Sequence, residues 1–167
     1  MNPNRSDFVR MVKHLLKFRL FLFWRLPAAY ISGARVKEID ENKAVVTVPY
    51  KWLSQNPFRS TYFACLSMAA EMSTGILALA EIHQLKPGVS MLVVKVESEY
   101  FKKATDRSTF VCEDGHLFRQ AVEETIATGE ARSVRARSVG RNKAGEVVAE
   151  FWVTWSFKVR SFDTTHK

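Results

Sequence analysis

The chain has 167 residues, with 25 Lys and Arg against 17 Asp and Glu, which gives a formal net charge of +8. Hydrophobic residues make up 47%, enough to build the core of a single domain without metal or disulfide staples. Two cysteines exclude a disulfide framework, and no Cys/His spacing suits zinc, so we expect no metal site. The charge fits nucleic acid, an anionic membrane or a phosphorylated ligand, and composition does not choose among them.

The segment from Phe8 to Trp24 predicts an amphipathic helix, with Ser6 as its N-cap and Pro27 at its end. Charged residues interrupt its apolar run, which falls far short of the roughly 20 residues needed to span a bilayer. The same charges make it a poor signal peptide, so we expect a cytoplasmic protein. We assign residues 1–27 to a helix packed on the domain, while contact with a membrane surface through this helix stays open.

The pattern changes to β-strand after this helix. Residues 30–39 and 44–50 are rich in β-branched and aromatic side chains, and the polar residues 40–43 between them favour a turn. We therefore predict a hairpin, followed by a loop over residues 51–60.

A long helix is predicted from Thr61 to His83. It is apolar on almost every side and rich in small residues, which indicates a buried helix. Its length would suit a membrane span, but its serines and its two glutamates, Glu71 and Glu81, argue against one.

The rest of the chain predicts antiparallel strands around one short helix, His116–Ala127. Alternation places Leu92, Val94, Val96 and Tyr100 on one face of the first strand. The predicted strands are Met91–Phe101, Ser108–Cys112, Arg132–Val139 and Glu146–Lys158. The order favours an α+β domain over residues 28–158, in which one curved antiparallel sheet wraps around the long helix, and a tail over residues 159–167.

Glu71 is the only Asp, Glu, Lys or Arg between Ser60 and Ala80. A carboxylate in a buried helix costs several kcal/mol unless it is paired or reaches a cavity. Burial should raise the pKa of Glu71 toward the range useful for a general base. The alternative is a structural role, in which Glu71 pairs with a basic side chain or lies at a subunit interface.

The start of the long helix is a second candidate. Its first backbone amides, near Tyr62 to Ala64, have no partner within the helix and could bind an oxyanion. Asn56, six residues before Tyr62, offers both a donor and an acceptor. The alternative for Asn56 is a turn residue, because Asn-Pro often opens a loop.

Residues 56–64 and 66–71 together resemble the signature of the hotdog-fold acyl-CoA thioesterases. That family shows an Asn, then His-Gly-Gly six residues later, then an acidic residue nine positions after the His. Asn56, Tyr62 and Glu71 have this spacing, and the likeness extends over roughly residues 28–158. The chain looks like a branch described as a domain of unknown function, close to the phenylacetate-type thioesterases. It departs from the signature at Tyr62, which replaces His, and at Phe63-Ala64, which replace Gly-Gly.

The resemblance implies a role for each matching residue. Glu71 would act as general base or nucleophile on the thioester carbonyl. The backbone amide of Phe63 or Ala64 would polarise the carbonyl oxygen, and Asn56 would orient the water or the carbonyl. In the family the active site lies at a dimer interface, so the resemblance implies a homodimer or a dimer of dimers.

Coenzyme A would then enter as part of the substrate, with no separate cofactor. Arg or Lys side chains can hold its phosphates by charge-assisted hydrogen bonds. The alternative that we favour for each single candidate is a solvated surface charge. The candidates are Arg59, Lys102, Lys103, Arg107, Arg135 and Arg137.

The function predicted from the sequence is therefore acyl-CoA hydrolysis without a metal, in a fold of the hotdog class. Abundant apolar residues near the helix favour a medium or long acyl chain. The first alternative is a non-catalytic protein that binds a lipid or acyl ligand, because the His-Gly-Gly element is altered. The second is association with a membrane surface or with nucleic acid through the basic N-terminal helix. We expect no nucleic-acid partner, so this alternative refers to a membrane surface.

Overall fold

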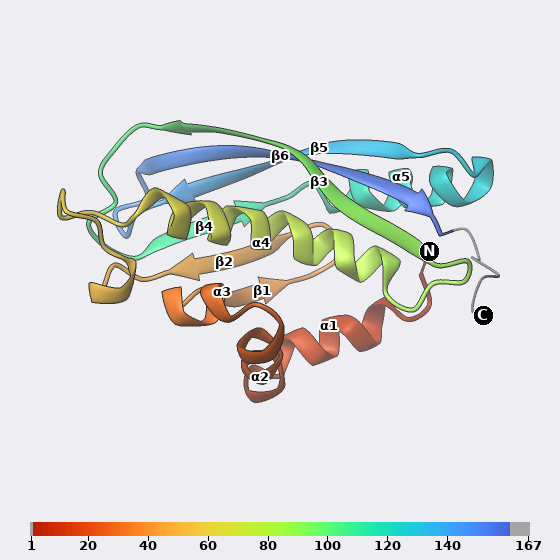
Figure 1. The fold of residues 1–167 in the computed structure, drawn as a ribbon, viewed down its shortest axis with the longest axis horizontal. Helices are drawn as coiled ribbons and strands as arrows, with labels where there is room; N and C mark the ends of the chain where they lie inside the picture. The colour runs from red at the N-terminus through yellow and green to blue at the C-terminus, as the bar shows by residue number, and fades with distance from the viewer. Residues whose placement is uncertain (1, 161–167) are drawn as a thin grey trace, which may run out of the picture.

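The structure, a computed structural model, describes residues 2–160 (Figure 1). It contains five α-helices, one 3-10 helix and six strands within that range. Only residues 159 and 160 of the predicted tail are described, and the remainder of the tail lies outside the described residues. The elements are α1 Arg5–Lys13, α2 Leu15–Arg25, α3 Pro27–Ser32, β1 Arg35–Ile39, β2 Ala44–Val48, η1 Trp52–Ser54, α4 Phe63–Ile82, β3 Val89–Tyr100, β4 Ser108–Cys112, α5 Gly115–Thr128, β5 Arg132–Arg141 and β6 Val147–Val159.

The six strands form one antiparallel sheet in the order β1-β2-β4-β5-β6-β3. The sheet curves around α4, as Figure 1 shows. Side chains from alternate positions of β6 pack under the helix, and Phe151, Val153 and Phe157 are fully buried. This arrangement confirms the predicted α+β hotdog fold.

Helix α4 has the length and composition of a membrane span, and it is the one helix among residues 2–160 that does. Most of its surface is nevertheless buried inside the domain. It packs against β2, β4 and β5 of the sheet and against α1 and α5. It is therefore a core helix, as its small and apolar residues predicted.

The N-terminal segment folds as two helices, and the prediction of one continuous helix is wrong. The chain breaks at His14, whose ψ of 96° is extended, between α1 and α2. In one straight helix the buried pairs Phe8/Val12 and Phe18/Leu22 would lie on faces about 80° apart, and the break lets both pairs face the domain. The prediction of Ser6 as N-cap is also wrong, because α1 already begins at Arg5.

The first predicted strand begins later than expected. Residues 27–32 form the short helix α3, with Pro27 in its first turn and Gly33 at its end in the left-handed conformation, φ 83°. The Ala34 N–H donates to the Ala29 carbonyl across this turn. The β-branched and aromatic residues that predicted a strand here therefore belong to a helix, and only Arg35–Ile39 forms β1.

The predicted alternation of β3 is also wrong in part. The pairing of β3 with β6 shifts between Val93 and Lys95, so Val94 is an extra, bulged residue. Leu92 lies opposite Ser156 and Val96 lies opposite Val153. Residues directly opposite each other in a sheet share a face. The bulge therefore puts Leu92 and Val96 on different faces, although the uninterrupted alternation placed them together.

The N-terminal residues hold the end of α4. The Asn2 side-chain amide donates to the carbonyls of Ala80, Glu81 and His83, which are otherwise unpaired at a helix end. Arg5 Nε lies 2.7 Å from Glu81 Oε1, and both side chains are buried. Arg5 also donates to the Asp40 carbonyl at 2.6 Å. This buried ion pair fastens α1 to the core helix.

We predict that Arg5→Met lowers the free energy of unfolding by about 3–5 kcal/mol, because it leaves the Glu81 carboxylate buried without a cation. Urea unfolding of the full chain measures the change. Adding Glu81→Leu to the Arg5→Met variant should recover most of the loss, since the second change removes the unpaired charge. A loss of under about 1 kcal/mol in the single variant, the range of an exposed ion pair, would contradict this role.

Candidate functional site

Glu71 lies near the middle of α4 and is half-buried. Its carboxylate has no hydrogen bond and no ion pair within residues 2–160. Burial raises the pKa of this carboxyl above its ordinary value, with no cation to oppose the shift. A buried carboxylate with a raised pKa is a stronger base than an exposed one.

Gly75, one turn after Glu71, makes room for that carboxylate. A Cβ at this position would lie 3.2 Å from Glu71 Oε1 and 3.0 Å from the Trp155 ring. The Trp155 indole N–H donates to Thr74 Oγ1 at 2.9 Å, and the Thr74 hydroxyl donates to the Glu71 carbonyl at 2.9 Å. The indole is thereby fixed beside the carboxylate. Gly75 and Trp155 are not among the residues predicted from the sequence, although the i,i+4 spacing of Gly75 from Glu71 is a signal for one of them.

The start of α4 leaves two backbone donors free. Tyr62, at the N-cap position, makes no side-chain cap. The N–H groups of Phe63 and Ala64 have no acceptor within the described part of the chain. The preceding amides are occupied, because Thr61 donates to Ala104 and Tyr62 donates to Ser54. The free amides at this positive end of the helix dipole are the predicted oxyanion donors.

Asn56 organises the loop before α4. Its side-chain oxygen accepts hydrogen bonds from the backbone of Phe58 at 3.0 Å and of Ser60 at 3.2 Å. The same oxygen contacts the Ser60 hydroxyl at 3.2 Å, and Arg59 within the turn has a left-handed φ of 58°. The acceptor half of the Asn56 amide is thus used by the turn. The Nδ2 group donates no hydrogen bond within residues 2–160.

A hollow of about 540 Å³ lies where the loop, the start of α4 and the end of β3 meet. It brings together three of the predicted catalytic residues, Asn56, Tyr62 and Phe63, with two of the predicted phosphate-binding residues, Lys102 and Lys103. Glu71 does not line it. At 1.5 Å per helical residue, Glu71 is about 12 Å along α4 from Phe63. Within one chain, therefore, the Glu71 carboxylate does not lie next to the free amides at the start of α4.

The predicted phosphate-binding cations lie in different places. Arg137 forms a two-pronged ion pair with Glu150, and Arg135 pairs with Glu97 while its guanidinium lies over the Trp152 ring. Lys102 pairs with Glu146. Arg59 is exposed in the Asn56 turn, and Lys103 lines the 540 Å³ hollow. Arg107 lies elsewhere, in a second hollow that contains other basic residues.

The described residues give little support to a metal site or to a cysteine nucleophile. No group of three His, Cys, Asp or Glu side chains between residues 2 and 160 is placed to hold a metal ion. Burial raises the pKa of the Cys112 thiol to about 12, and it raises the pKa of the Cys65 thiol as well. Neither thiol is therefore an activated nucleophile.

Residues 18–157 match the protein family described as "Domain of unknown function (DUF4442)". None of the curated proteins matches the chain.

Several solved structures are similar to this one. The probable thioesterase PA5026 from Pseudomonas aeruginosa is 19% identical, with a TM-score of 0.72 over 90% of this chain and 95% of its own. The thioesterase HI1161 from Haemophilus influenzae is 14% identical, with a TM-score of 0.64 over 89% of this chain and 94% of its own. OLEI01261, a protein of unknown function from Chlorobaculum tepidum, is 14% identical, with a TM-score of 0.74 over 87% and 94%. At these identities the likeness establishes the fold.

We predict that Glu71→Gln stabilises the protein at neutral pH and leaves its stability nearly unchanged in acid. The pKa of Glu71 is raised in the folded state, so the folded protein binds this proton more tightly than the unfolded chain. The stabilisation from the protonated carboxyl is complete below the unfolded pKa and is lost as the pH rises through the folded pKa. Glutamine mimics the protonated form and does not titrate.

Thermal unfolding of both proteins between about pH 4 and pH 8 measures this difference, since each kcal/mol shifts the Tm of a domain this size by roughly 2–4 °C. The Tm gap should widen as the pH rises. Glu113→Gln, which changes an exposed carboxylate, is the control and should show no such trend. A gap that is constant with pH would mean that Glu71 titrates as an exposed glutamate does.

Proposed function

The chain belongs to the DUF4442 family and has the fold of the hotdog thioesterases, and from this premise we propose that it hydrolyses an acyl-CoA thioester. The observation that carries the proposal is the Glu71 carboxylate, which is half-buried, unpaired within residues 2–160 and raised in pKa. Its spacing from the free amides at the start of α4 matches the thioesterase signature. A base and an oxyanion site are the two groups that hydrolysis of a thioester requires.

In the proposed reaction, Glu71 takes a proton from a water molecule while the water oxygen attacks the thioester carbonyl carbon. The negative charge that develops on the carbonyl oxygen is stabilised by the N–H groups of Phe63 and Ala64. The tetrahedral intermediate then collapses, and the carbon–sulfur bond breaks. The proton held by Glu71 passes to the departing coenzyme A sulfur, which restores the carboxylate.

Direct attack by the Glu71 carboxylate is the other route that the resemblance implies. It would give an acyl anhydride, which water then hydrolyses. A single turnover in ¹⁸O water reveals the anhydride route when water attacks the Glu71 carbonyl of the anhydride, because only that attack leaves ¹⁸O in the Glu71 side chain.

The proposed site requires two copies of the chain, because Glu71 and the helix start are about 12 Å apart along one helix. Strand β3 is an edge of the sheet and has no partner on its outer side among residues 2–160. It exposes apolar side chains, with Leu92 66% exposed and Val94 and Val96 about half exposed. Such an edge favours pairing with another strand. We propose a homodimer in which Glu71 of one chain faces Asn56 and the amides of the other.

The hollow at the helix start is the proposed place for the substrate. Aromatic side chains from three segments line it and are 45–73% exposed to solvent, which suits an apolar acyl chain. Arg59 and Lys103 flank this region and are the proposed partners of the coenzyme A phosphates. The aromatic residues are Phe58, Tyr62, Phe63, Tyr100 and Phe101.

A second candidate function is the binding of an acyl ligand without hydrolysis. Two observations favour it. Phe63 and Ala64 carry side chains where the thioesterase signature has glycines, which limits how closely a ligand can approach the amides. The Asn56 side-chain oxygen is also committed to the Asn56–Ser60 turn.

We predict that the purified protein hydrolyses at least one member of a panel of acyl-CoAs, and that Glu71→Gln lowers kcat by at least about 100-fold, the usual contribution of a general base. Release of free thiol, followed with a thiol reagent, measures the rate. Glu113→Gln, which alters an exposed carboxylate, should keep full activity. Unchanged turnover in Glu71→Gln would remove Glu71 from the mechanism. Saturable binding of acyl-CoA without any turnover would establish the second candidate function.

We also predict that Val96→Arg converts the dimer to a monomer and abolishes hydrolysis, because it places a charge on the exposed apolar edge of β3. Sedimentation velocity gives the oligomeric state. Ala127→Arg, at an exposed position of α5, is the matched control and should stay dimeric and active. A monomeric wild-type protein with full activity would contradict the two-chain site.

A further inference from the structure

Helix α2 exposes most of its apolar side chains. Only Phe18 and Leu22 of its eleven residues are buried. Leu15, Leu16 and Trp24 are 73%, 69% and 74% exposed. The large exposed apolar side chains of α2 and α3 form what we name the apolar face: Leu15, Leu16, Leu20, Phe23, Trp24 and Ile31. Single exposed apolar residues are ordinary, but a contiguous group on one helix and its neighbour marks an interaction surface.

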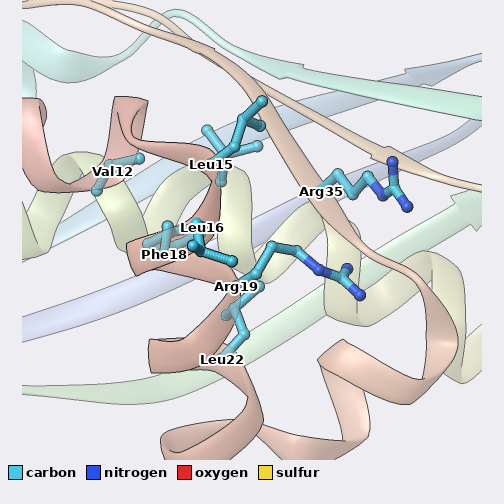
Figure 2. A pocket seen from close by; sticks show the side chains of 8 residues that line it. Val12, Leu15, Leu16, Phe18, Arg19, Leu22 and Arg35 are labelled. Atoms are coloured by element: carbon cyan, nitrogen blue, oxygen red, sulfur yellow. The ribbon is translucent and has the colours of Figure 1, made fainter.

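A hollow of about 300 Å³ opens beside this face, between α2 and the start of β1. Its lining is mostly apolar, from Val12, Leu15, Leu16 and Phe18. Figure 2 shows these side chains on one side, and the guanidinium groups of Arg19 and Arg35 extending away from them. The hollow is therefore apolar at one end and cationic at the other.

The two arginines also line a second hollow of about 280 Å³, which we name the cationic basin. Five basic residues from four separate segments line it, and no acidic residue does. None of the five forms an ion pair within the described range of the chain. The Arg19 Nη1 atom is buried without a hydrogen-bond acceptor. The five are Arg19, Arg35, Lys37, Lys51 and Arg107.

The basin and the apolar face are one continuous surface. The Arg19 guanidinium lies 4.2 Å from the centre of the Tyr30 ring. Tyr30 packs edge-on against Phe23 with 5.4 Å between ring centres, and Phe23 packs against Trp24 at the same separation. A ligand that fills one part of this surface therefore meets the other.

We propose that this surface docks the protein on an anionic lipid bilayer, with the apolar face in the headgroup and acyl boundary and a lipid phosphate in the cationic basin. Basic residues next to apolar and aromatic side chains are the composition by which helices lie in a membrane interface. An anionic leaflet supplies the negative charge that the five unpaired cations lack. One occupant thus accounts for both halves of the surface.

Two other occupants explain only half of the surface. A second copy of this chain would cover the apolar face but bring two sets of five like charges together, which opposes association. A soluble phosphorylated ligand would neutralise the basin but leave Leu15, Leu16 and Trp24 in water. The experiment distinguishes each of these two occupants from a bilayer.

The experiment measures binding of the full chain to vesicles of phosphatidylcholine, with and without phosphatidylglycerol, by co-sedimentation. We expect binding to the vesicles that contain phosphatidylglycerol, weakening steeply as salt rises from about 0.05 to 0.5 M because exposed charges are screened. The emission of Trp24 should shift to the blue as its ring leaves water. Trp24→Phe should lose most of that shift while it still sediments with the vesicles.

Two variants test the two halves of the surface. Arg35→Gln with Lys37→Gln should weaken vesicle binding roughly 25-fold, because each basic residue near an anionic surface contributes about five-fold. Lys86→Gln with Lys158→Gln removes the same charge at exposed positions near the opposite edge of the sheet and should change binding far less. Leu16→Ser with Trp24→Ser should also weaken binding, and because both side chains are exposed the fold should persist.

Several results would overturn the proposal. If the two charge variants weaken vesicle binding equally, the vesicles attract the protein through its net charge and not through the cationic basin. No binding to either vesicle, together with binding of inorganic phosphate that Arg35→Gln with Lys37→Gln abolishes, would make the basin a site for a soluble anion. A change of oligomeric state in Leu16→Ser with Trp24→Ser, without a change in vesicle binding, would make the face an interface between copies.

Discussion

The fold depends on one constraint, which is that α4 has no polar face and must be covered on nearly every side. A single flat sheet covers only one side of a helix, so the strands curve around it and α5 closes another side. The N-terminal segment supplies a further cover. Asn2 caps the carbonyls at the end of α4, and Arg5 neutralises the buried Glu81. The break at His14 follows from the same requirement, because it turns the buried residues of both α1 and α2 toward the domain.

The cover is incomplete along one stripe of α4, and the proposed chemistry depends on that gap. Ala64, Met68 and Glu71 are only half-buried, and they lie on the same helix face by their spacing. Burial deprives the Glu71 carboxylate of water without giving it a cation. The same desolvation makes the ionised form costly for stability and makes the group a better base. Gly75 leaves space beside the carboxylate, and the Trp155 ring borders that space.

The features that the sequence predicted well are those set by local pattern. The apolar run of α4, the alternation of β6 and the hairpin of β1 and β2 each follow from side chains within one segment. The features that it predicted wrongly are decided by contacts between segments. The bulge at Val94 reverses the faces of β3 through its pairing with β6, and helix α3 forms because Pro27 and Gly33 fit its two ends. The alternation of apolar residues in a sequence reveals neither a bulged residue nor a helix cap.

The same distinction holds for the candidate site. Glu71 was found because an isolated charge in an apolar segment is visible in one dimension. Asn56 was found by spacing, but its use by the turn at Ser60 depends on the path of the loop. Gly75 is meaningful only once Trp155, eighty residues later, is seen to approach it. Residue type and spacing therefore locate a catalytic candidate, whereas the shape around it comes from segments distant in the chain.

The net charge of +8 illustrates how the third dimension changes the meaning of composition. The arginines of β5 looked available in the sequence, but Arg135 and Arg137 face Glu97 and Glu150 across the strands and are neutralised locally. The unpaired charge instead gathers where α2, β1 and two loops converge, although no segment of the sequence contains a basic cluster at that point. Like charges that gather without counter-ions repel one another, so their arrangement is favourable only with an anion bound or with water close by. The apolar face beside them is equally unfavourable in water, and one contact with an anionic, partly apolar surface relieves both costs.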